Sequence, residues 1–192
     1  MRPAVFLDRD GTLVDELGFL ARAEDLRLLP GAAAAVGRLN ERGLAVIVVT
    51  NQSGIARGLF GERELAEVHA RLGQELARAG ARLDDVLYCP HHPSEGAPPW
   101  RRHCECRKPA PGLVLEAARR HELGLAESWM IGDSLRDLEC GARAGLAGSI
   151  LVRTGKGAEE LQGLSASERA RTLVADDVGA AVELLLTRLE RR

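Results

Sequence analysis

The chain has 192 residues, with 26 Lys and Arg, 28 Asp and Glu and a formal net charge of −2, which excludes the overall basic field that a nucleic-acid or acidic-membrane binder normally carries. Hydrophobic residues make up 45% of the chain and aromatic residues 3%, so a core of Ala, Val, Leu and Ile is expected within one domain spanning residues 1–192. No apolar run reaches the roughly 20 residues needed to cross a bilayer, and no secretory signal precedes the first expected strand, so we expect a cytoplasmic protein.

Short apolar runs alternate with longer helical stretches along the chain. This alternation predicts a mostly parallel sheet with helices on both faces, a Rossmann-like three-layer α/β sandwich, and no insertion is long enough for a separate cap domain. Pro30 and Gly31 start the first helix and Gly43 ends it, whereas the Gly-rich, polar stretch 155–167 is expected to be a mobile surface connection. In chain order, the expected strands are residues 4–7, 44–49, 86–88, 129–131, 149–152 and 172–175, and the expected helices are residues 31–42, 62–79, 111–121, 135–144 and 178–192.

Two carboxylates, Asp8 and Asp10, follow the first expected strand, where Gly11 and Thr12 break the apolar run. Open α/β sheets bind ligands at the carboxyl ends of their strands, and alternation along an extended backbone would point both carboxylates to the same side. Two carboxylates facing a phosphate need a divalent cation, and Mg²⁺ prefers such oxygen ligands. The spacing indicates a phosphoryl-transfer nucleophile beside its acid/base partner, although a pair of solvated turn aspartates fits the same spacing.

Polar side chains also follow two later strands. Thr50 comes directly after the second apolar run, and Asp133 follows the fourth run through a glycine. Lys108 lies between them in the chain. Lys108 and Lys156 are the only lysines in the sequence, and the remaining Lys and Arg positions are all arginine. This usage indicates that a compact ammonium is required at Lys108, where a guanidinium would not serve.

Cysteine and histidine residues gather at the two ends of a loop spanning residues 89–106. Cys89, His91 and His92 stand at one end, and His103, Cys104 and Cys106 stand at the other. Two close groups of soft ligands predict a tetrahedral zinc site, and three thiolates with one imidazole would leave no open position, so the zinc would be structural. Spacing leaves open which histidine binds, as well as the alternative of reduced, unligated cysteines. Cys140, on an expected helix, is interpreted as a small packing residue.

In this order, the motifs around Asp8, Thr50, Lys108 and Asp133 resemble those of the haloacid dehalogenase superfamily of phosphotransferases over nearly the whole chain. The resemblance implies that Asp8 takes the phosphoryl group as an aspartyl-phosphate, and that Asp10 protonates the leaving alcohol and then activates water. It also implies that Thr50 and Lys108 hold the phosphoryl oxygens. The Mg²⁺ site would combine the carboxylates of Asp8 and Asp133 with the backbone carbonyl of Asp10.

The cysteine loop narrows the resemblance to two groups of this superfamily, the D-glycero-D-manno-heptose 1,7-bisphosphate 7-phosphatases and the histidinol-phosphate phosphatases. The heptose group is more similar, because its members have a motif like that of residues 50–58 and a zinc loop about as long as residues 89–106. Histidinol-phosphate enzymes usually have a shorter loop and an acidic residue at the Ser53 position. The heptose resemblance implies a place in nucleotide-activated heptose synthesis, for lipopolysaccharide core or surface glycan, and the zinc ligands Cys89, His91, Cys104 and Cys106.

The same resemblance implies how a phosphorylated sugar would be bound. The planar guanidinium of Arg107 would grip the distal phosphate. Residues 16–19 belong to the loop after the first strand, here called the flap, and would line the sugar. Phe19 stands where tyrosine is often expected in this group. The implied substrate-binding residues are Glu16, Leu17, Gly18, Phe19, Asn51, Gln52, Ser53 and Arg107.

Several alternatives carry different expectations. Histidinol phosphate is the nearest alternative substrate. A receiver-type phospho-acceptor domain would be phosphorylated stably without turnover, and a zinc-dependent interaction module would keep its partner after Asp8→Asn. A nucleic-acid 3′-phosphatase would need a basic, aromatic-rich strand-binding stretch, which the sequence lacks. We expect a monomer, since no surplus apolar helix face stands out.

Overall fold

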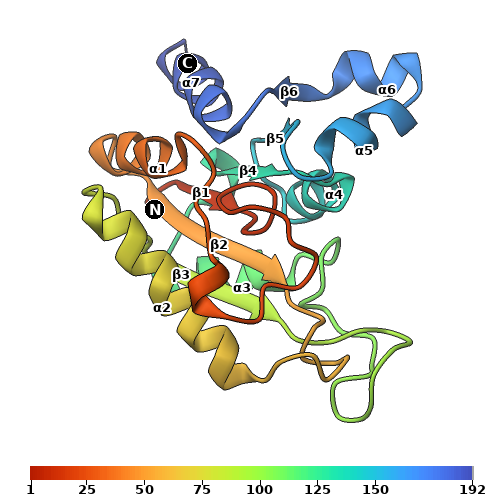
Figure 1. Cartoon of the computed structure of the whole chain (residues 1–192). Helices are drawn as coiled ribbons and strands as arrows, with labels where there is room; N and C mark the ends of the chain where they lie inside the picture. Colours follow the sequence, from red (N-terminus) through yellow and green to blue (C-terminus); the bar gives the residue numbers. More distant parts are fainter. Residues whose placement is uncertain (192) are drawn as a thin grey trace.

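Six parallel strands form a sheet at the centre of the structure, a computed structural model that describes residues 1–191 (Figure 1). The strands are β1 (Ala4–Leu7), β2 (Ala45–Asn51), β3 (Asp85–Cys89), β4 (Trp129–Gly132), β5 (Gly148–Val152) and β6 (Leu173–Ala175). Their order is β3-β2-β1-β4-β5-β6, and every neighbouring pair is parallel. The predicted parallel sheet is therefore confirmed.

Helices cover both faces of the sheet, which confirms the three-layer α/β prediction. They are α1 (Ala32–Glu41), α2 (Glu62–Arg78), α3 (Gly112–His121), α4 (Leu135–Arg143), α5 (Gly157–Gly163), α6 (Ala166–Arg171) and α7 (Val178–Glu190), with 3-10 turns η1 (Ala23–Asp25) and η2 (Leu125–Glu127). Helices α1, α2 and α7 share one apolar core with the sheet, and α3 and α4 share the other. No helix within the described residues is long and apolar enough to span a membrane.

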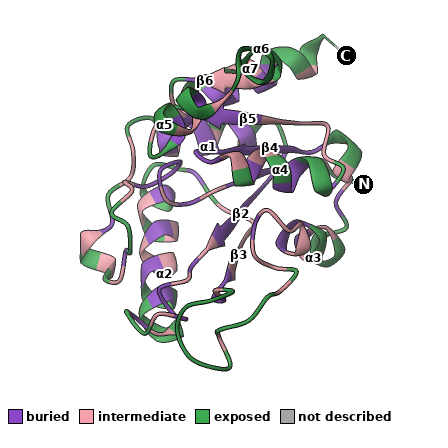
Figure 2. Cartoon of the chain, turned by 90° about the vertical axis from the view of Figure 1, so that its right-hand side faces the viewer, coloured by how far each residue is buried: buried purple, intermediate pink, exposed green. Residues whose placement is uncertain are grey.

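The side chains of β1 explain why its sequence is continuously apolar. Val5 and Leu7 belong to the core beneath α1, α2 and α7, whereas Ala4 and Phe6 belong to the core beneath α3 and α4. Each of the four is at most 1% exposed. A strand buried on both faces has no polar side to alternate with, so the chemistry of this sheet is confined to its edges. Figure 2 shows the buried strands between the helices, and the largely exposed loop after β3.

The register of the strands brings their carboxyl ends to one edge. Leu7 pairs with Val48 on one side and with Ile131 on the other. The residues that follow these positions in β1, β2 and β4 therefore emerge close together. Asp8, Thr50 and Asp133 occupy that edge.

Residues 155–167, expected to be a mobile surface connection, contain helical structure that the sequence analysis did not predict. Helix α5 occupies most of this stretch, and α6 begins at Ala166. Leu161 is buried, and Gly157 packs so closely that an added Cβ would lie 1.7 Å from the Val152 carbonyl oxygen. The glycine that indicated flexibility thus allows a helix to approach β5, while Ser165 caps α6 by accepting from the Glu168 backbone N–H at 3.3 Å.

We expect Ser128→Ala to lower the free energy of unfolding by about 1–3 kcal/mol. Ser128 is fully buried, and its hydroxyl accepts from the Ala4 backbone N–H at 2.8 Å while donating to the Gly124 carbonyl at 2.7 Å. Its loss would leave the first amide of β1 without an acceptor. Urea unfolding measures the change, and the exposed Ser167→Ala is the matched control, expected within about 0.5 kcal/mol of the parent. Equal stability of the two variants would contradict this role of Ser128.

Candidate active site

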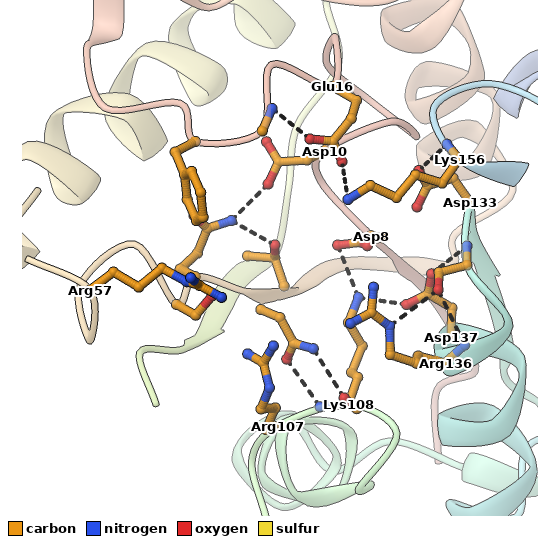
Figure 3. Close-up of a pocket in the computed structure, with 17 residues that line it drawn as sticks. Asp8, Asp10, Glu16, Arg57, Arg107, Lys108, Asp133, Arg136, Asp137 and Lys156 are labelled. Carbon is orange, nitrogen blue, oxygen red and sulfur yellow. Dashed lines mark hydrogen bonds and ion pairs between the residues drawn. The ribbon is translucent and has the colours of Figure 1, made fainter. Parts of the chain in front are cut away.

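A hollow of about 230 Å³ lies at the carboxyl edge of the sheet, where the loops after β1, β2 and β4 meet the end of the 89–106 loop (Figure 3). Its lining carries both acidic and basic side chains, so it can hold a cation together with an anionic group. Leu17, predicted as a substrate contact, does not line it and is 55% exposed. The predicted residues that do line it are Asp8, Asp10, Glu16, Gly18, Phe19, Thr50, Asn51, Gln52, Ser53, Arg107, Lys108 and Asp133.

Lys108 is buried between two carboxylates. Its Nζ lies 2.9 Å from Asp8 Oδ1 and 2.6 Å from Asp137 Oδ1. Burial alone would lower the pKa of this ammonium, but the Asp137 and Asp8 carboxylates raise the pKa of Lys108 above its ordinary value. A fixed positive charge therefore stands beside the Asp8 carboxylate at neutral pH.

Asn51 fixes the backbone that carries this lysine. Its Nδ2 donates to the Lys108 carbonyl at 3.0 Å, and its Oδ1 accepts from the Lys108 backbone N–H at 3.0 Å. The sequence predicts a substrate contact at Asn51, and the structure places it in the hollow with its amide already used by the protein. The direct effect of Asn51 is to hold the end of β2 against the segment that bears Lys108.

The Asp10 carboxylate is held by two neighbouring side chains, Arg9 and Gln52. Arg9, fully buried, donates through Nη2 to both Asp10 oxygens at 2.9 Å. Gln52 Nε2 donates to Asp10 Oδ2 at 2.7 Å and to Thr50 Oγ1 at 2.9 Å. Burial raises the pKa of Asp10, and the charge of Arg9 opposes that rise. The raised pKa helps Asp10 to retain a proton, and the hydrogen bonds fix its orientation. Such a carboxyl group can serve as a general acid.

The Arg9 guanidinium extends this network to α2. Its Nη1 lies 3.2 Å from Nε2 of His69. Burial, with a smaller contribution from the charge of Arg9, lowers the pKa of His69 to about 3, so this imidazole is neutral and can accept the Arg9 N–H. Sequence reasoning missed Arg9, because nothing in the pattern of a loop residue between two aspartates indicates a buried cation.

Asp133 sits in a notch formed by backbone. Its Oδ2 accepts from the Lys156 backbone N–H at 2.8 Å. A Cβ added at Gly11 or at Gly155 would lie 2.1 Å from the same oxygen, and both glycines have positive φ. Burial raises the pKa of Asp133 to about 7, and the nearby Asp8 charge adds to the rise. Burial and the Asp8 charge both disfavour the Asp133 carboxylate, so a cation bound close by would stabilise the deprotonated form.

Carboxylate oxygens of Asp8, Asp133 and Asp137 all lie within 4.8 Å of one another, a spacing that can hold a metal ion. Asp137 is already engaged, by Lys108 and by the backbone N–H of Ser134 at 3.1 Å. Asp8 and Asp133 each use a single oxygen in contacts with the described residues, Oδ1 of Asp8 and Oδ2 of Asp133, so each has a second oxygen for a cation. Such hard oxygen donors suit Mg²⁺. Sequence reasoning missed Asp137, although an acid at the third position of a helix opened by serine is a signal for a cap.

Four soft ligands form a second cluster at the two ends of the 89–106 loop, namely Cys89, His91, Cys104 and Cys106. The sulfur atoms are 3.2 to 3.6 Å apart, and His91 Nδ1 lies 3.3 Å from the Cys106 sulfur. Ideal tetrahedral bonds of about 2.3 Å separate two sulfurs by roughly 3.8 Å, so the donor set fits zinc with little adjustment. Hydrogen bonding, first with Cys89 and then with Cys104 and His91, lowers the pKa of Cys106 to about 5, which favours a thiolate.

The histidines left open by the sequence occupy different places. His91 is buried within the cluster, whereas His92 Nδ1 accepts from the backbone N–H of Glu95 at 3.0 Å. The His103 side chain is exposed to solvent and is not part of the cluster. Cys140 is fully buried in the core beneath α3 and α4, as predicted for a packing residue.

The flap after β1 closes one side of the hollow. Lys156 Nζ lies 3.0 Å from Glu16 Oε2, and the Arg57 guanidinium lies 5.5 Å from the centre of the Phe19 ring. Arg57 is also paired with Glu95 of the cysteine loop. Figure 3 shows these cations spread around the hollow, together with Arg107 and Arg136. The sequence did not single out Arg57 or Arg136, because arginine is common throughout the chain.

Comparisons with known proteins agree with this arrangement. A family profile described as HAD-hydrolase-like matches residues 105–181. The D-glycero-beta-D-manno-heptose-1,7-bisphosphate 7-phosphatase of Photorhabdus laumondii is 42% identical over 80% of this chain and 82% of its own, and that of Escherichia coli K12 is 40% identical over 80% and 81%. The chain belongs to this family of haloacid dehalogenase-like phosphatases. Membership confirms the resemblance read from the motifs and makes the chain a phosphoric monoester hydrolase.

Solved structures agree with the family assignment. The D,D-heptose 1,7-bisphosphate phosphatase of B. bronchiseptica, in complex with magnesium and phosphate, superimposes with a TM-score of 0.83 at 38% identity, covering 98% of this chain and 99% of its own. A HAD-like phosphatase from Mesorhizobium loti gives 0.84 at 36% identity, covering 99% of this chain and 87% of its own. The magnesium of the first supports Mg²⁺ chemistry in this family of phosphatases.

In magnesium-free buffer, we expect Asp133→Asn to become more stable relative to the parent as the pH rises from 5 to 7. Folding raises the pKa of Asp133 from 3.8 to about 7, so between these values the folded parent binds more protons than the unfolded chain and loses stability with rising pH. Asparagine does not titrate. Urea unfolding at pH 5, 6 and 7 should show the difference growing by on the order of 1 kcal/mol per pH unit. A pH-independent difference would contradict the raised pKa.

Proposed function

We propose that the chain hydrolyses the 7-phosphate of D-glycero-D-manno-heptose 1,7-bisphosphate and leaves heptose 1-phosphate for the synthesis of nucleotide-activated heptose. The observation that carries this proposal is that Asp8, Lys108 and Asp133 meet in one hollow with the Asp10 carboxyl. The names of the P. laumondii and E. coli relatives support the choice of sugar.

Asp8 would act as the nucleophile. An Asp8 carboxylate oxygen forms the bond to phosphorus while the bond from phosphorus to the C7 oxygen breaks, and Asp10 gives its proton to that oxygen. The Lys108 ammonium and the Thr50 hydroxyl donate to the phosphoryl oxygens as charge moves onto them. Gln52 bridges Asp10 and Thr50, so the acid and the phosphate ligand keep a fixed relation.

Hydrolysis of the aspartyl-phosphate would complete the cycle. Asp10, now a carboxylate, takes a proton from water as the water oxygen attacks phosphorus, and the Asp8 carboxylate leaves. Mg²⁺ held by Asp8, Asp133 and the Asp10 backbone carbonyl would neutralise phosphoryl charge in both steps. Arg9 and Gln52 orient the Asp10 carboxyl for both proton transfers.

The sugar would lie between the flap and the cysteine loop, in a single domain without a separate cap. Glu16, Gly18 and Phe19 would contact it from the flap, and Ser53 from the loop after β2. Arg107 lines the hollow and donates through Nη1 to the His91 carbonyl at 3.1 Å, which directs its guanidinium from the cysteine cluster toward the substrate. We assign the distal phosphate to this guanidinium.

The cysteine cluster would hold a structural zinc ion through Cys89, His91, Cys104 and Cys106. The 89–106 loop has few buried residues between its two ends, so packing alone orders it weakly. Four ligands would satisfy the ion completely, leaving no position for substrate. Its effect on activity would be to fix Arg107 and Lys108, which follow directly after Cys106.

Phosphate release should be fastest from an anomer of heptose 1,7-bisphosphate and slower from histidinol phosphate at equal concentration, with Mg²⁺ present. Asp8→Asn should stay folded, since Asp137 still pairs with the Lys108 ammonium, and should lose about 10⁴-fold or more in kcat, because it keeps the shape of the side chain without the nucleophile. Asp15→Asn, on the same segment but outside the hollow, is the matched control and should retain activity. Preference for histidinol phosphate would overturn the substrate, and steady turnover by Asp8→Asn would overturn the mechanism.

Removal of zinc should weaken stability and substrate recognition together. Cys106→Ala should purify with little zinc, melt at least about 5 °C below the parent and show a raised KM. Cys140→Ala, which lies outside the cluster, should keep its zinc. Metal analysis, thermal melting and steady-state kinetics in excess Mg²⁺ measure these effects. Unchanged melting and KM in a protein verified to lack zinc would rule out the structural role.

A further inference from the structure

The cationic side chains around the hollow differ in whether a carboxylate neutralises them. Lys108, Lys156 and Arg57 each form an ion pair with at least one acidic side chain. Arg107 and Arg136 form none with the carboxylates of residues 1–191; Arg107 donates to a backbone carbonyl and Arg136 Nε to a serine hydroxyl at 3.3 Å. Two guanidinium charges at one site therefore remain available to an anion.

These two arginines also border a second hollow. A groove of about 260 Å³ runs beside the first hollow, and Arg107, Lys108 and Arg136 line both. The groove adds Arg102 and His103 from the cysteine loop. No carboxylate is among the described residues that line it, in contrast to the mixed charges of the first hollow. Figure 3 shows Lys108 between Arg107 and Arg136 in the first hollow.

The position of Arg136 is set by α4. It is the second residue of that helix, and the Ser134 hydroxyl accepts from both its backbone N–H, at 3.4 Å, and its Nε. Of the guanidinium nitrogens, only Nε is used by the contact with Ser134. The terminal nitrogens, Nη1 and Nη2, make no hydrogen bond to the protein within the described residues, so they can form a bidentate pair with a phosphate.

We propose that this groove binds the second phosphate of a bisphosphorylated substrate, with Arg136 as a specificity-determining residue opposite Arg107. The proposal rests on the proposed function, since it requires a substrate with two phosphates. Lys108 contacts the phosphate that reacts, and Arg107 and Arg136 contact the one that does not. Their uncompensated charge also repels a substrate whose far end is cationic, such as histidinol phosphate with its amino group.

The test compares two substrates that differ only in the distal phosphate, heptose 1,7-bisphosphate and heptose 7-phosphate. Arg136→Gln should lower the ratio of kcat/KM between them by roughly tenfold or more, since one charge-assisted pair is lost. Arg136→Lys should restore part of the ratio. Arg101→Gln, an equal charge change on the neighbouring loop outside the groove, should leave the ratio unchanged. An unchanged ratio in Arg136→Gln, or an equal loss on both substrates, would overturn the proposal.

A binding measurement separates this proposal from the choice of sugar. Calorimetric titration of the Mg²⁺-loaded parent with inorganic phosphate should detect two sites, of which Arg136→Gln loses one and Arg101→Gln loses none. A single phosphate site in the parent, or two in Arg136→Gln, overturns the groove. A parent that retains two phosphate sites yet does not prefer the bisphosphate keeps the groove and overturns the proposed function.

Discussion

A buried ammonium group between two carboxylates determines how the segments of the site fit together. An unpaired charge in the interior costs several kcal/mol, and the carboxylates of Asp8 and Asp137 on either side of the Lys108 ammonium remove that cost. Asp8 follows β1, Asp137 lies in α4, and Asn51 at the end of β2 fixes the lysine backbone. One ion-pair network thus aligns β1, β2, α4 and the cysteine loop at the same point.

A second buried cation plays a comparable part on the other side of Asp8. Arg9 lies beneath the Asp10 carboxylate and contacts His69 on α2. Because both faces of the sheet are apolar, the strand ends are the places where such charges can gather. The nucleophile and the proposed acid therefore share one edge but have different environments, a lysine for the first and a buried arginine for the second.

The sequence was most informative where local pattern determines position. Strand ends placed Asp8, Thr50 and Asp133 correctly at one edge, because apolar runs and their termination are local properties. It failed for Arg9 and Asp137, whose burial depends on packing between distant segments, and for residues 155–167, where glycine and polar residues were compatible with helix. The choice among three histidines also required the path of the whole cysteine loop, which spacing does not encode.

The notch around Asp133 has a consequence for how this chain can diverge. Gly11 and Gly155 come from opposite ends of the sequence, and each would place a methyl group 2.1 Å from the same oxygen. The added Cβ would also lie 2.9 Å or less from the Cα of the other glycine, and both glycines have positive φ, so alanine is disfavoured at either position while Asp133 stays. Natural variants that keep the carboxylate should therefore keep both glycines, although the two positions are 144 apart in the sequence.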